Sequence, residues 1–417
     1  MFDEYAPIKK IILDTVKTLA ETQTFNVDLF LNQMEGAFKS AGFRETGNNT
    51  AIKSILLLRI DAAGDFILST PAIRAIRENY PNAYITLVVD EKIFKLAELC
   101  PYVNEVLAIE EQHSFDYLKN IGYTANFSAT HLWQRRFDLA ICLGTVYKLI
   151  RNFLMYLSGA RQRVTFFFDE LGKIFNTHCY PMIEECNTHD VMINLYLLKE
   201  HGLKIGNTDI EVWFNNSDLY TARRLLQNFG EGRIKIAAGI GANSPERKYP
   251  IEKYLVAFKQ IINKGASLVI FGGQSEIDDA KFLEDNLPEG CVKNFVELKA
   301  GWRIDAAAMS LTDIYVGNFT GACDVAAALK KPVVVLSRVA RDIKNIFKGI
   351  NESERYLPWK TVSAIVRPAH QLEECKSKPN FQGCTAGKAH CIAQIEPDEI
   401  VYAFDKMIDF MKKNSAR

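Results

Sequence analysis

The first segment whose residues suggest chemistry is a strand exit that carries an aspartate. It reads RIDAAGDFILSTPAIRAIREN over residues 59–79 and continues the apolar run that begins at Ile55. Gly64 permits a tight turn close to a ligand, and Asp65 follows where a helix begins. A carboxylate in the first helical turn is often only a favourable partner of the helix dipole. The other interpretation is a general base at the rim of a ligand cleft, and this segment leaves both open.

A second segment has the residue types that bind a diphosphate. It reads GIGANSPERKYP over 239–250, with Arg247 and Lys248 after a run of small residues and Pro250 suited to a helix start. Backbone N–H groups at a helix N-terminus and two cations suit phosphate oxygens. An ordinary loop with a solvated basic pair is the alternative. The segment lacks the GK[ST] ending of a Walker A loop and the GxGxxG pattern of a dinucleotide fold.

Two further strand exits have the composition of nucleotide-contacting loops. FGGQSEIDDA places Glu276 just after a Gly-Gly pair, where an acid can bind ribose hydroxyls or cap the next helix. VGNFTGACDVAAALKKPVVVL places Thr320 as a natural N-cap, and Gly321 lets a ligand approach the helix N-terminus. Each segment is weak evidence alone. Four of them at corresponding strand ends indicate a ligand site.

Cations interleaved with apolar residues mark a further segment, YKLIRNFLMYLSGARQR over 147–163. Such a surface suits a phosphorylated glycolipid at the inner membrane surface. An amphipathic core helix with a solvated basic face is the alternative. Together with the arginine that ends the first strand, the candidate acceptor ligands are Arg59, Lys148, Arg151, Arg161 and Arg163.

The cysteines point to reduced thiols. There are 9, an odd number, and most stand singly inside apolar runs, which argues against a disulfide framework. Cys375, Cys384 and Cys391 cluster with His370 and His390 before the last helix, at spacings that differ from those of a zinc ribbon or finger. We expect a structural thiol cluster and no metal, and a bound metal stays open as the alternative.

Two sheets must position these segments. From Ser54 onward, short apolar strands alternate with helical segments, which predicts parallel sheets with right-handed crossovers. Ligands of such sheets bind beyond the carboxyl ends of the strands. We therefore expect an α/β fold of two Rossmann-like domains facing across a cleft. The predicted strands are 55–60, 84–90, 105–110, 137–144, 163–168 and 210–214 in the first half, and 234–241, 267–273, 295–298, 313–318, 332–337 and 362–366 in the second.

Helices precede and follow the two halves. Ile8, Ile11 and Ile12 begin an apolar set at three- and four-residue steps, which predicts a helical N-terminal extension. An oligomerisation helix or a membrane-surface helix is the alternative. The predicted division of the chain is an extension over 1–50, domains over 51–218 and 219–395, and a last helix over 396–417 that has the option of packing back on the N-terminal domain.

Composition excludes several classes of protein. The 417 residues are 48% hydrophobic, as in ordinary globular proteins, and 50 Lys+Arg balance 50 Asp+Glu, which argues against bulk nucleic-acid binding. No apolar run approaches the roughly 20 residues of a membrane span. The start, MFDEYAPIKKIILDTV, lacks the cleavage site of a signal peptide. We expect a cytoplasmic protein.

Taken in order, these segments resemble the ADP-heptose:lipopolysaccharide heptosyltransferases, glycosyltransferase family 9, of GT-B architecture. The resemblance runs from about Ile55 to Met411 and is carried by RIDAAGDFILSTPAIRAIRENYP, GANSPERKYP, FGGQSE, GNFTGACDVAAAL and CIAQIEPDEIV. It implies inverting, metal-independent transfer of a sugar from a nucleotide-diphosphate donor, ADP-heptose in the first place, to a hydroxyl of an anionic lipopolysaccharide-core or other saccharide acceptor. It implies no cofactor and leaves open a peripheral contact with the inner membrane surface.

The resemblance also implies roles for single residues. Asp65 matches the family's proposed catalytic base. The first domain, 51–218, would bind the acceptor, and the second, 219–395, the nucleotide sugar. The residues that match or adjoin the family's donor-binding positions are Arg247, Lys248, Glu276, Thr320 and Gly321.

Two positions depart from the family pattern. Phe319 and Asp324 stand where the family's D-T-G-x-x-H segment has its Asp and His. A phenyl ring forms no hydrogen bond with a sugar hydroxyl. A different nucleotide sugar, a relative that binds without transferring, and a GT-B-shaped nucleotide-sugar epimerase therefore stay open.

Overall fold

The structure is a computed structural model that describes residues 6–22, 26–43, 51–110, 117–144, 149–168, 170–182, 188–338, 355–370, 372–373 and 387–415. Lys148, Cys375 and Cys384 lie outside these ranges. Contacts divide the chain into two compact units that are interleaved in sequence. Unit 1 comprises Met1–Ala62, Ala72–Ile183 and Ile193–Asn207, and unit 2 comprises Ala63–Pro71, Glu184–Met192 and Thr208–Arg417.

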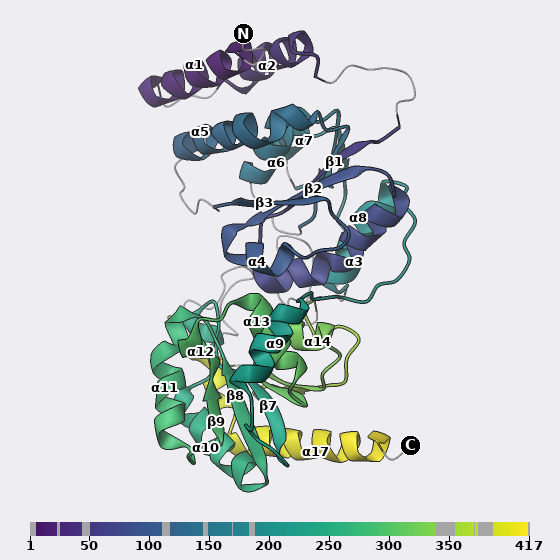
Figure 1. Cartoon of the computed structure of the whole chain (residues 1–417). Helices are drawn as coiled ribbons and strands as arrows, with labels where there is room; N and C mark the ends of the chain where they lie inside the picture. Colours follow the sequence, from purple (N-terminus) through teal and green to yellow (C-terminus); the bar gives the residue numbers. More distant parts are fainter. Residues whose placement is uncertain are drawn as a thin grey trace. The chain divides into compact units, whose positions relative to one another are not determined.

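Unit 1 is built on a six-stranded sheet in the order β3-β2-β1-β4-β5-β6, of which Figure 1 labels β1, β2 and β3. The strands are β1 Ser54–Arg59, β2 Tyr84–Asp90, β3 Glu105–Ile109, β4 Leu139–Cys142, β5 Gln162–Phe166 and β6 His178–Tyr180. All neighbours pair in parallel, and Ile55 of β1 pairs with both Ile85 and Leu139. The apolar run of β1 is buried because a central parallel strand is covered on both faces. This strand order is that of a Rossmann sheet.

Helices flank this sheet. They are α1 Ala6–Thr22, α2 Val27–Ser40, α4 Phe94–Ala97, α5 Tyr117–Phe127, α6 Leu149–Leu157 and α7 Glu170–Phe175, with short turns η1 Glu91–Ile93, η2 Ser128–Leu132 and η3 Trp133–Arg135. Two more, α3 Ala63–Asn79 and α8 Asp190–Glu200, begin in residues that contacts assign to unit 2 and end in unit 1.

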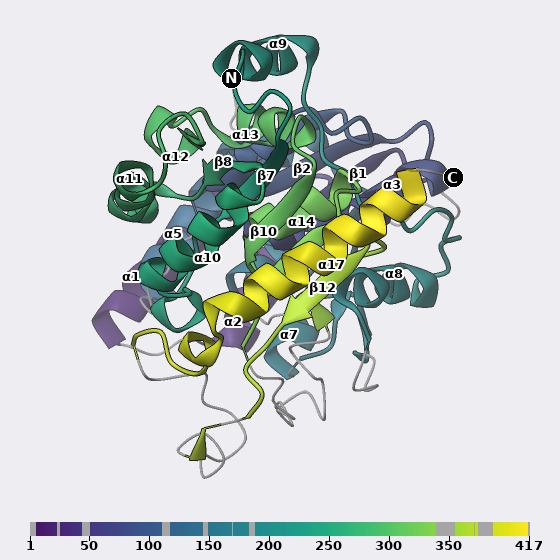
Figure 2. The same cartoon turned by 90° about the horizontal axis from the view of Figure 1, so that it is seen from below.

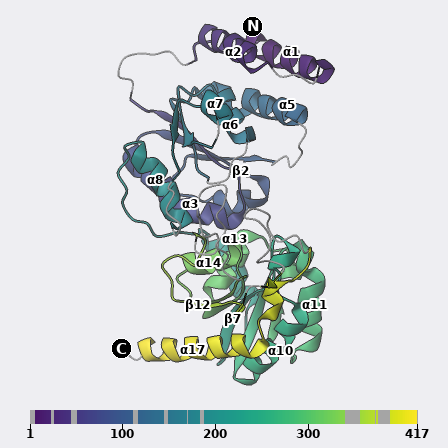
Figure 3. The same cartoon turned by 180° about the vertical axis from the view of Figure 1, so that it is seen from behind.

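The N-terminal extension is helical, as predicted, and is part of the core of unit 1. Helix α2 begins at Asn26, whose side-chain oxygen accepts a hydrogen bond from the Leu29 N–H. Figure 3 shows α1 and α2 as an outer layer beside α5, α6 and α7. One cluster of buried side chains joins these layers: Ile8, Ile12, Phe30, Met34, Phe38, Trp133, Phe153, Tyr156 and Phe175.

Unit 2 repeats the same topology. Its parallel sheet has the order β12-β11-β10-β7-β8-β9, so β7 and β10 take the central places that β1 and β4 take in unit 1. The strands are β7 Ile234–Gly239, β8 Ala266–Phe271, β9 Val292–Asn294, β10 Ile314–Asn318, β11 Val333–Leu336 and β12 Ser363–Val366. Two Rossmann-like α/β sheets of equal strand number confirm the predicted fold class.

The helices of unit 2 are α9 Asn216–Leu225, α10 Ile251–Asn263, α11 Ile277–Asn286, α12 Phe295–Leu298, α13 Trp302–Ser310, α14 Gly321–Ala328 and α17 Pro397–Ser415, with short turns η4 Pro245–Arg247, η5 Gln274–Glu276 and η6 Cys391–Gln394. Helix α17 packs on α10, β11 and β12 (Figure 2). Its buried Phe404, Met407 and Ile408 belong to the core of unit 2. The apolar face of the last helix is therefore buried within unit 2, and its packing on the N-terminal domain stays a prediction.

Two predicted strands are wrong. Residues 210–214 form no strand, because their polar groups bond to side chains: the Glu211 N–H donates to Thr70 Oγ1, and Trp213 Nε1 donates to Glu211 Oε2. The last strand of the first sheet is β6 instead. Residues 295–298 are helix α12, because the Asn294 side chain accepts from the two following N–H groups and starts a helical turn.

The described cysteines are free thiols: Cys100, Cys142, Cys291, Cys323 and Cys391 are buried and Cys179 is half-buried. Within the described residues, no group of His, Cys, Asp and Glu is arranged to hold a metal ion. The predicted cysteine cluster stays a prediction, because of its three members the structure describes Cys391 alone. None of the helices in the described ranges has both the length and the apolarity needed to cross a membrane.

Candidate functional site

Asn318, the last residue of β10, fixes the loop that follows β7 at the carboxyl edge of the second sheet. Its Nδ2 donates to the carbonyls of Ile240 and Gly241 at 2.9 and 3.1 Å. Its Oδ1 accepts from the Tyr254 hydroxyl at 2.9 Å and from the Tyr249 N–H at 3.3 Å. Asn318 was not among the predicted site residues. The feature of the sequence that could have indicated it is a single amide side chain at the end of an otherwise apolar strand.

Lys248 and Glu276, two predicted donor ligands from different loops, lie together at this edge. Lys248 Nζ is 3.2 Å from Glu276 Oε1 and 2.7 Å from Asp279 Oδ2. Burial lowers the pKa of Lys248, but hydrogen bonding and attraction from the two carboxylates outweigh it and raise the pKa above the usual range. The ammonium is therefore charged at neutral pH.

Glu276 is 3% exposed and its carboxylate holds the β8 loop as well. It accepts hydrogen bonds from the Gly273 N–H and the Ser275 hydroxyl, both at 2.8 Å. A Cβ atom at Gly241 would lie 3.0 Å from Glu276 Oε2, so the β7 loop approaches the same carboxylate closely. Arg247, by contrast, ends the short turn η4 and is exposed. The edge therefore presents one cation fixed by carboxylates and one on the surface.

The N-terminus of α14 lies against the first turn of α3. Thr320 is the N-cap residue by its backbone, yet its side chain forms no capping hydrogen bond. A Cβ atom at Gly321 would lie 2.9 Å from the Gly64 nitrogen and 3.2 Å from Ala63 Cβ. The missing side chain at 321 is what allows this approach. The first N–H groups of a helix have no partner within the helix, so they suit an anion.

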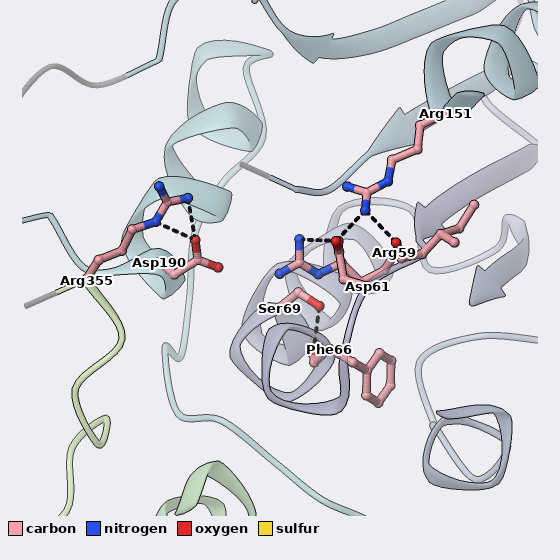
Figure 4. Close-up of polar contacts among 8 residues, drawn as sticks. Arg59, Asp61, Phe66, Ser69, Arg151, Asp190 and Arg355 are labelled. Atoms are coloured by element: carbon pink, nitrogen blue, oxygen red, sulfur yellow. Dashed lines mark hydrogen bonds and ion pairs between the residues drawn. The ribbon is translucent and has the colours of Figure 1, made fainter. Parts of the chain in front are cut away.

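Asp65 lies in the first turn of α3, in the segment that contacts assign to unit 2. Within this unit, Asp324 of α14 is 6% exposed. Burial, and then the carboxylates of Asp65 and Asp190, raise the pKa of Asp324 well above its usual range. Asp190, at the start of α8, accepts from Arg355 Nε at 3.0 Å and Nη2 at 2.8 Å (Figure 4). Asp65 and Asp190, each in the first turn of its helix, thus act on the carboxyl group in the first turn of α14.

Unit 1 carries its own charged cluster at the carboxyl ends of its central strands. Arg59 ends β1 and is 1% exposed, and Arg151 of α6 is 2% exposed. Both contact Asp61: Arg59 Nη1 lies 3.1 Å from Oδ2, and Arg151 Nη2 donates to Oδ1 (Figure 4). Two guanidinium groups therefore share one carboxylate. Asp61 was not predicted, although it directly follows the predicted strand 55–60.

The other predicted acceptor ligands lie elsewhere. Arg161 precedes β5 and pairs with Asp138 at 3.4 Å. Arg163 is buried, and its Nε and Nη1 donate to the carbonyls of Phe175 and Ala160, both at 2.7 Å. Both positions are at the amino end of their strand, away from the carboxyl edge. Arg59 and Arg151 are thus the described candidates that the structure brings together.

Comparison with known proteins gives the family. The model of "Glycosyltransferase family 9 (heptosyltransferase)" matches residues 131–378. The chain is 24% identical over 288 residues to lipopolysaccharide heptosyltransferase 3 of Escherichia coli (strain K12), which covers 66% of this chain and 79% of that protein.

Solved structures show the same fold. A glycosyltransferase family 9 protein from Veillonella parvula DSM 2008 superposes with a TM-score of 0.67 at 18% identity, over 85% of this chain and 97% of its own. The E. coli ADP-heptose lps heptosyltransferase II gives a TM-score of 0.66 at 16% identity, over 86% of this chain and 99% of its own. Since the family match covers more than half of the residues, the chain belongs to glycosyltransferase family 9, the heptosyltransferases of GT-B architecture, and is a glycosyltransferase.

Proposed function

We propose that this enzyme transfers heptose from ADP-heptose to a hydroxyl of the lipopolysaccharide core, on the cytoplasmic side of the membrane. The names of the relatives above support this donor and this acceptor. The observation that carries the proposal is in unit 2. A charged lysine, a buried glutamate and the open N-terminus of α14 gather at the carboxyl edge of its sheet, and Asp65 lies in the helix start that α14 contacts.

The proposed reaction is a direct displacement. The acceptor hydroxyl attacks the anomeric carbon, its proton passes to the Asp65 carboxylate, and the bond from that carbon to the diphosphate breaks. Arg247, Lys248 and the N–H groups that follow Thr320 and Gly321 stabilise the departing diphosphate. Glu276 orients Lys248, and its proposed further role is to accept a hydrogen bond from a ribose hydroxyl of the donor. Fixed cations and a helix dipole take over the charge stabilisation that a metal ion supplies in other enzymes.

The acceptor is proposed to bind at the arginine cluster of unit 1. Arg59 and Arg151 place two guanidinium groups around the carboxylate of Asp61. A phosphate group accepts two parallel hydrogen bonds from a guanidinium, which a neutral sugar does not do equally well. An anionic saccharide or glycolipid fits this charge, and contact with the membrane surface follows if the acceptor stays in its lipid.

The test is Asp65→Asn, measured with ADP-heptose and a lipopolysaccharide-core acceptor. Asn preserves size but accepts no proton, and a positioned base contributes about 10²–10⁴-fold. We expect turnover to fall by about that factor with little change in Tm or donor affinity. Asp28→Asn, in the first turn of α2, is the matched control for loss of a helix-dipole partner.

Near-normal turnover of Asp65→Asn would show that Asp65 is not the general base.

A thermal-shift panel of ADP-, UDP-, GDP- and CDP-sugars tests the identity of the donor, because a ligand at 100 times its Kd stabilises the folded protein by about 2.7 kcal/mol. Binding without transfer in the wild type would favour the binding-only relative that Phe319 and Asp324 suggest. An epimerised donor in the absence of acceptor would favour the epimerase.

A further inference from the structure

Two helix starts approach each other within unit 2, and each carries a carboxyl group. Asp65 is in the first turn of α3, and Asp324 is in the first turn of α14. The backbones come close because glycine stands on both sides. A Cβ atom at Gly64 would lie 2.4 Å from Asp324 Oδ2, and one at Gly321 would lie 2.9 Å from the Gly64 nitrogen. The carboxyl of Asp324 is thus packed against the residue that precedes Asp65.

Burial of the Asp324 side chain is energetically unfavourable. It is 6% exposed, and its Oδ1 is buried with no hydrogen-bond partner in the described part of the chain. A buried oxygen without a hydrogen-bond partner destabilises the folded protein, and more so if it is charged. Buried polar atoms without a partner are rare in folded proteins, so this one needs an explanation, and a role in the site is one.

The charges around Asp324 favour its protonated form. Asp65 faces it from α3 and Asp190 faces it from α8. Cys323, its neighbour on α14, and Tyr315 of β10 are also within electrostatic reach, and neither brings a positive charge. Arg355, the described partner of Asp190, is bonded to that carboxylate. Burial first, and then the carboxylates of Asp65 and Asp190, raise the pKa of Asp324 well above its usual range, which favours its protonated form.

We propose that Asp324 is a positioning residue for the base, and that in the donor-free protein it holds the single proton of an Asp65–Asp324 carboxyl pair. The inference rests on the proposed role of Asp65. Protonated Asp324 leaves Asp65 as the ionised member, ready to take the proton of the acceptor hydroxyl. After transfer both carboxyls are protonated, and the new proton leaves to solvent with the products. The protonated group also adds no negative charge beside the incoming diphosphate.

The experiment compares wild type, Asp324→Asn and Asp324→Ala from pH 5 to pH 9. Asn imitates the protonated carboxyl, so kcat near pH 7 should stay within about twofold of wild type, whereas Ala removes the positioning group and should lower kcat about tenfold. Ionisation of Asp324 at alkaline pH should raise the donor KM of the wild type by about tenfold, through repulsion of the diphosphate. Asp324→Asn should lack this alkaline limb. Asp398→Asn, an exposed first-turn aspartate of α17, is the control.

Melting curves test the pair without any substrate. The folded protein keeps a proton that the unfolded chain releases above the ordinary pKa of Asp, so wild-type stability falls as pH rises toward the folded pKa. Asp324→Asn carries no such penalty. Its Tm advantage over wild type should therefore grow by several degrees from pH 5 to pH 8.

Three outcomes would each contradict the proposed Asp65–Asp324 pair. The donor KM of Asp324→Asn could rise at alkaline pH as in the wild type, or the Tm difference between the two could be independent of pH. The third outcome is an Asn variant that is as inactive as the Ala variant. Failure of the proposed function is seen separately. It appears as a wild type that transfers nothing from ADP-heptose while the pH dependence of Tm remains as expected.

Discussion

At the scale of the residue, Lys248 and Arg247 are neighbours with different surroundings. Lys248 is bonded to the buried carboxylate of Glu276, whereas Arg247 is exposed. Both are proposed to contact the donor diphosphate. Substituting each residue separately distinguishes an effect on donor binding from an effect on the stability of the fold. Loss of Lys248 removes a cation from beside the buried carboxylate of Glu276.

We expect Lys248→Ala and Arg247→Ala each to weaken ADP binding by about tenfold or more, since a charge-assisted hydrogen bond contributes about 1.5–3 kcal/mol. Lys248→Ala should in addition lower Tm more than Arg247→Ala does, because Lys248 pairs with the buried Glu276 carboxylate. Calorimetric titration with ADP and melting curves measure the two effects. Lys281→Ala, an exposed lysine of α11, is the control. Unchanged ADP affinity in both variants would move the phosphate site elsewhere.

The arginine cluster of unit 1 gives a second prediction for single residues. Arg151→Gln removes one of the two guanidinium groups that contact Asp61 within the described ranges and leaves Arg59. We expect the acceptor KM to rise about tenfold or more, because a bidentate contact to phosphate is lost, while the donor KM stays constant. Steady-state kinetics with varied acceptor measures this.

Arg161→Gln is the comparison for that variant, since this arginine lies before the amino end of β5. An equal rise of acceptor KM in both variants would assign the effect to overall charge rather than to the cluster.

At the scale of the element, the approach of α3 and α14 depends on the absence of a side chain at Gly64. We expect Gly64→Ala to reduce turnover and Tm together, because its Cβ would clash with the Asp324 carboxyl at 2.4 Å. Gly122→Ala in α5 is the matched control, since nothing lies within 4 Å of its Cβ position. Alanine is favoured over glycine in a helix by about 0.5–1 kcal/mol, so the control should be neutral or stabilising. Equal Tm changes in the two variants would contradict the close approach.

Sequence alone predicts elements well where a long apolar run has one explanation. The buried runs of β1, β2 and β7 leave no alternative to a central strand, and their predicted positions agree with the structure. Short runs are ambiguous. The four residues of FVEL suit a strand by composition, but a side-chain cap at Asn294 turns them into a helix.

Site residues also differ in how far the sequence alone predicts them. The predicted donor ligands Lys248 and Glu276 follow strand ends, so topology brings them together. The role that we propose for Asp324 depends instead on tertiary packing. The sequence marks it as a departure from the family, but its burial and its proximity to Gly64 depend on packing between segments about 260 residues apart, which no local pattern encodes.

At the scale of the whole molecule, the last helix is part of the second core. Ile400, Val401, Phe404, Met407 and Ile408 of α17 are buried there. At about 1.5–3 kcal/mol for each buried large side chain, the helix contributes on the order of the 5–15 kcal/mol that stabilises a typical protein.

We therefore expect a chain that ends before Pro397 to lose the cooperative unfolding of unit 2, observed by near-ultraviolet circular dichroism and limited proteolysis. A chain that ends after Lys413, which keeps every buried residue of α17, should unfold like the full chain. Native-like melting of the shorter chain would show that α17 is dispensable.

The interleaving of the units limits how the molecule can be divided. A fragment that begins at Thr208 contains most of unit 2 but lacks Ala63–Pro71 and Glu184–Met192. It therefore lacks Asp65, and it leaves the buried Arg355 without Asp190. Such a fragment is a poor substitute for the full chain in binding experiments.

The strand order has a consequence for the moment of synthesis. Ile55 of β1 finds its partner on β2 within 30 residues, but its partner on β4, Leu139, is 84 residues further along the chain. A ribosome adds about 5–20 residues per second, so one edge of the central strand waits about 4–17 s for its neighbour. In unit 2, β7 waits about as long for β10, because Ile236 pairs with Ile314. Each nascent sheet thus spends seconds with an apolar, unpaired edge exposed. That interval is when the chain is most open to chaperones and to pairing with other copies of itself.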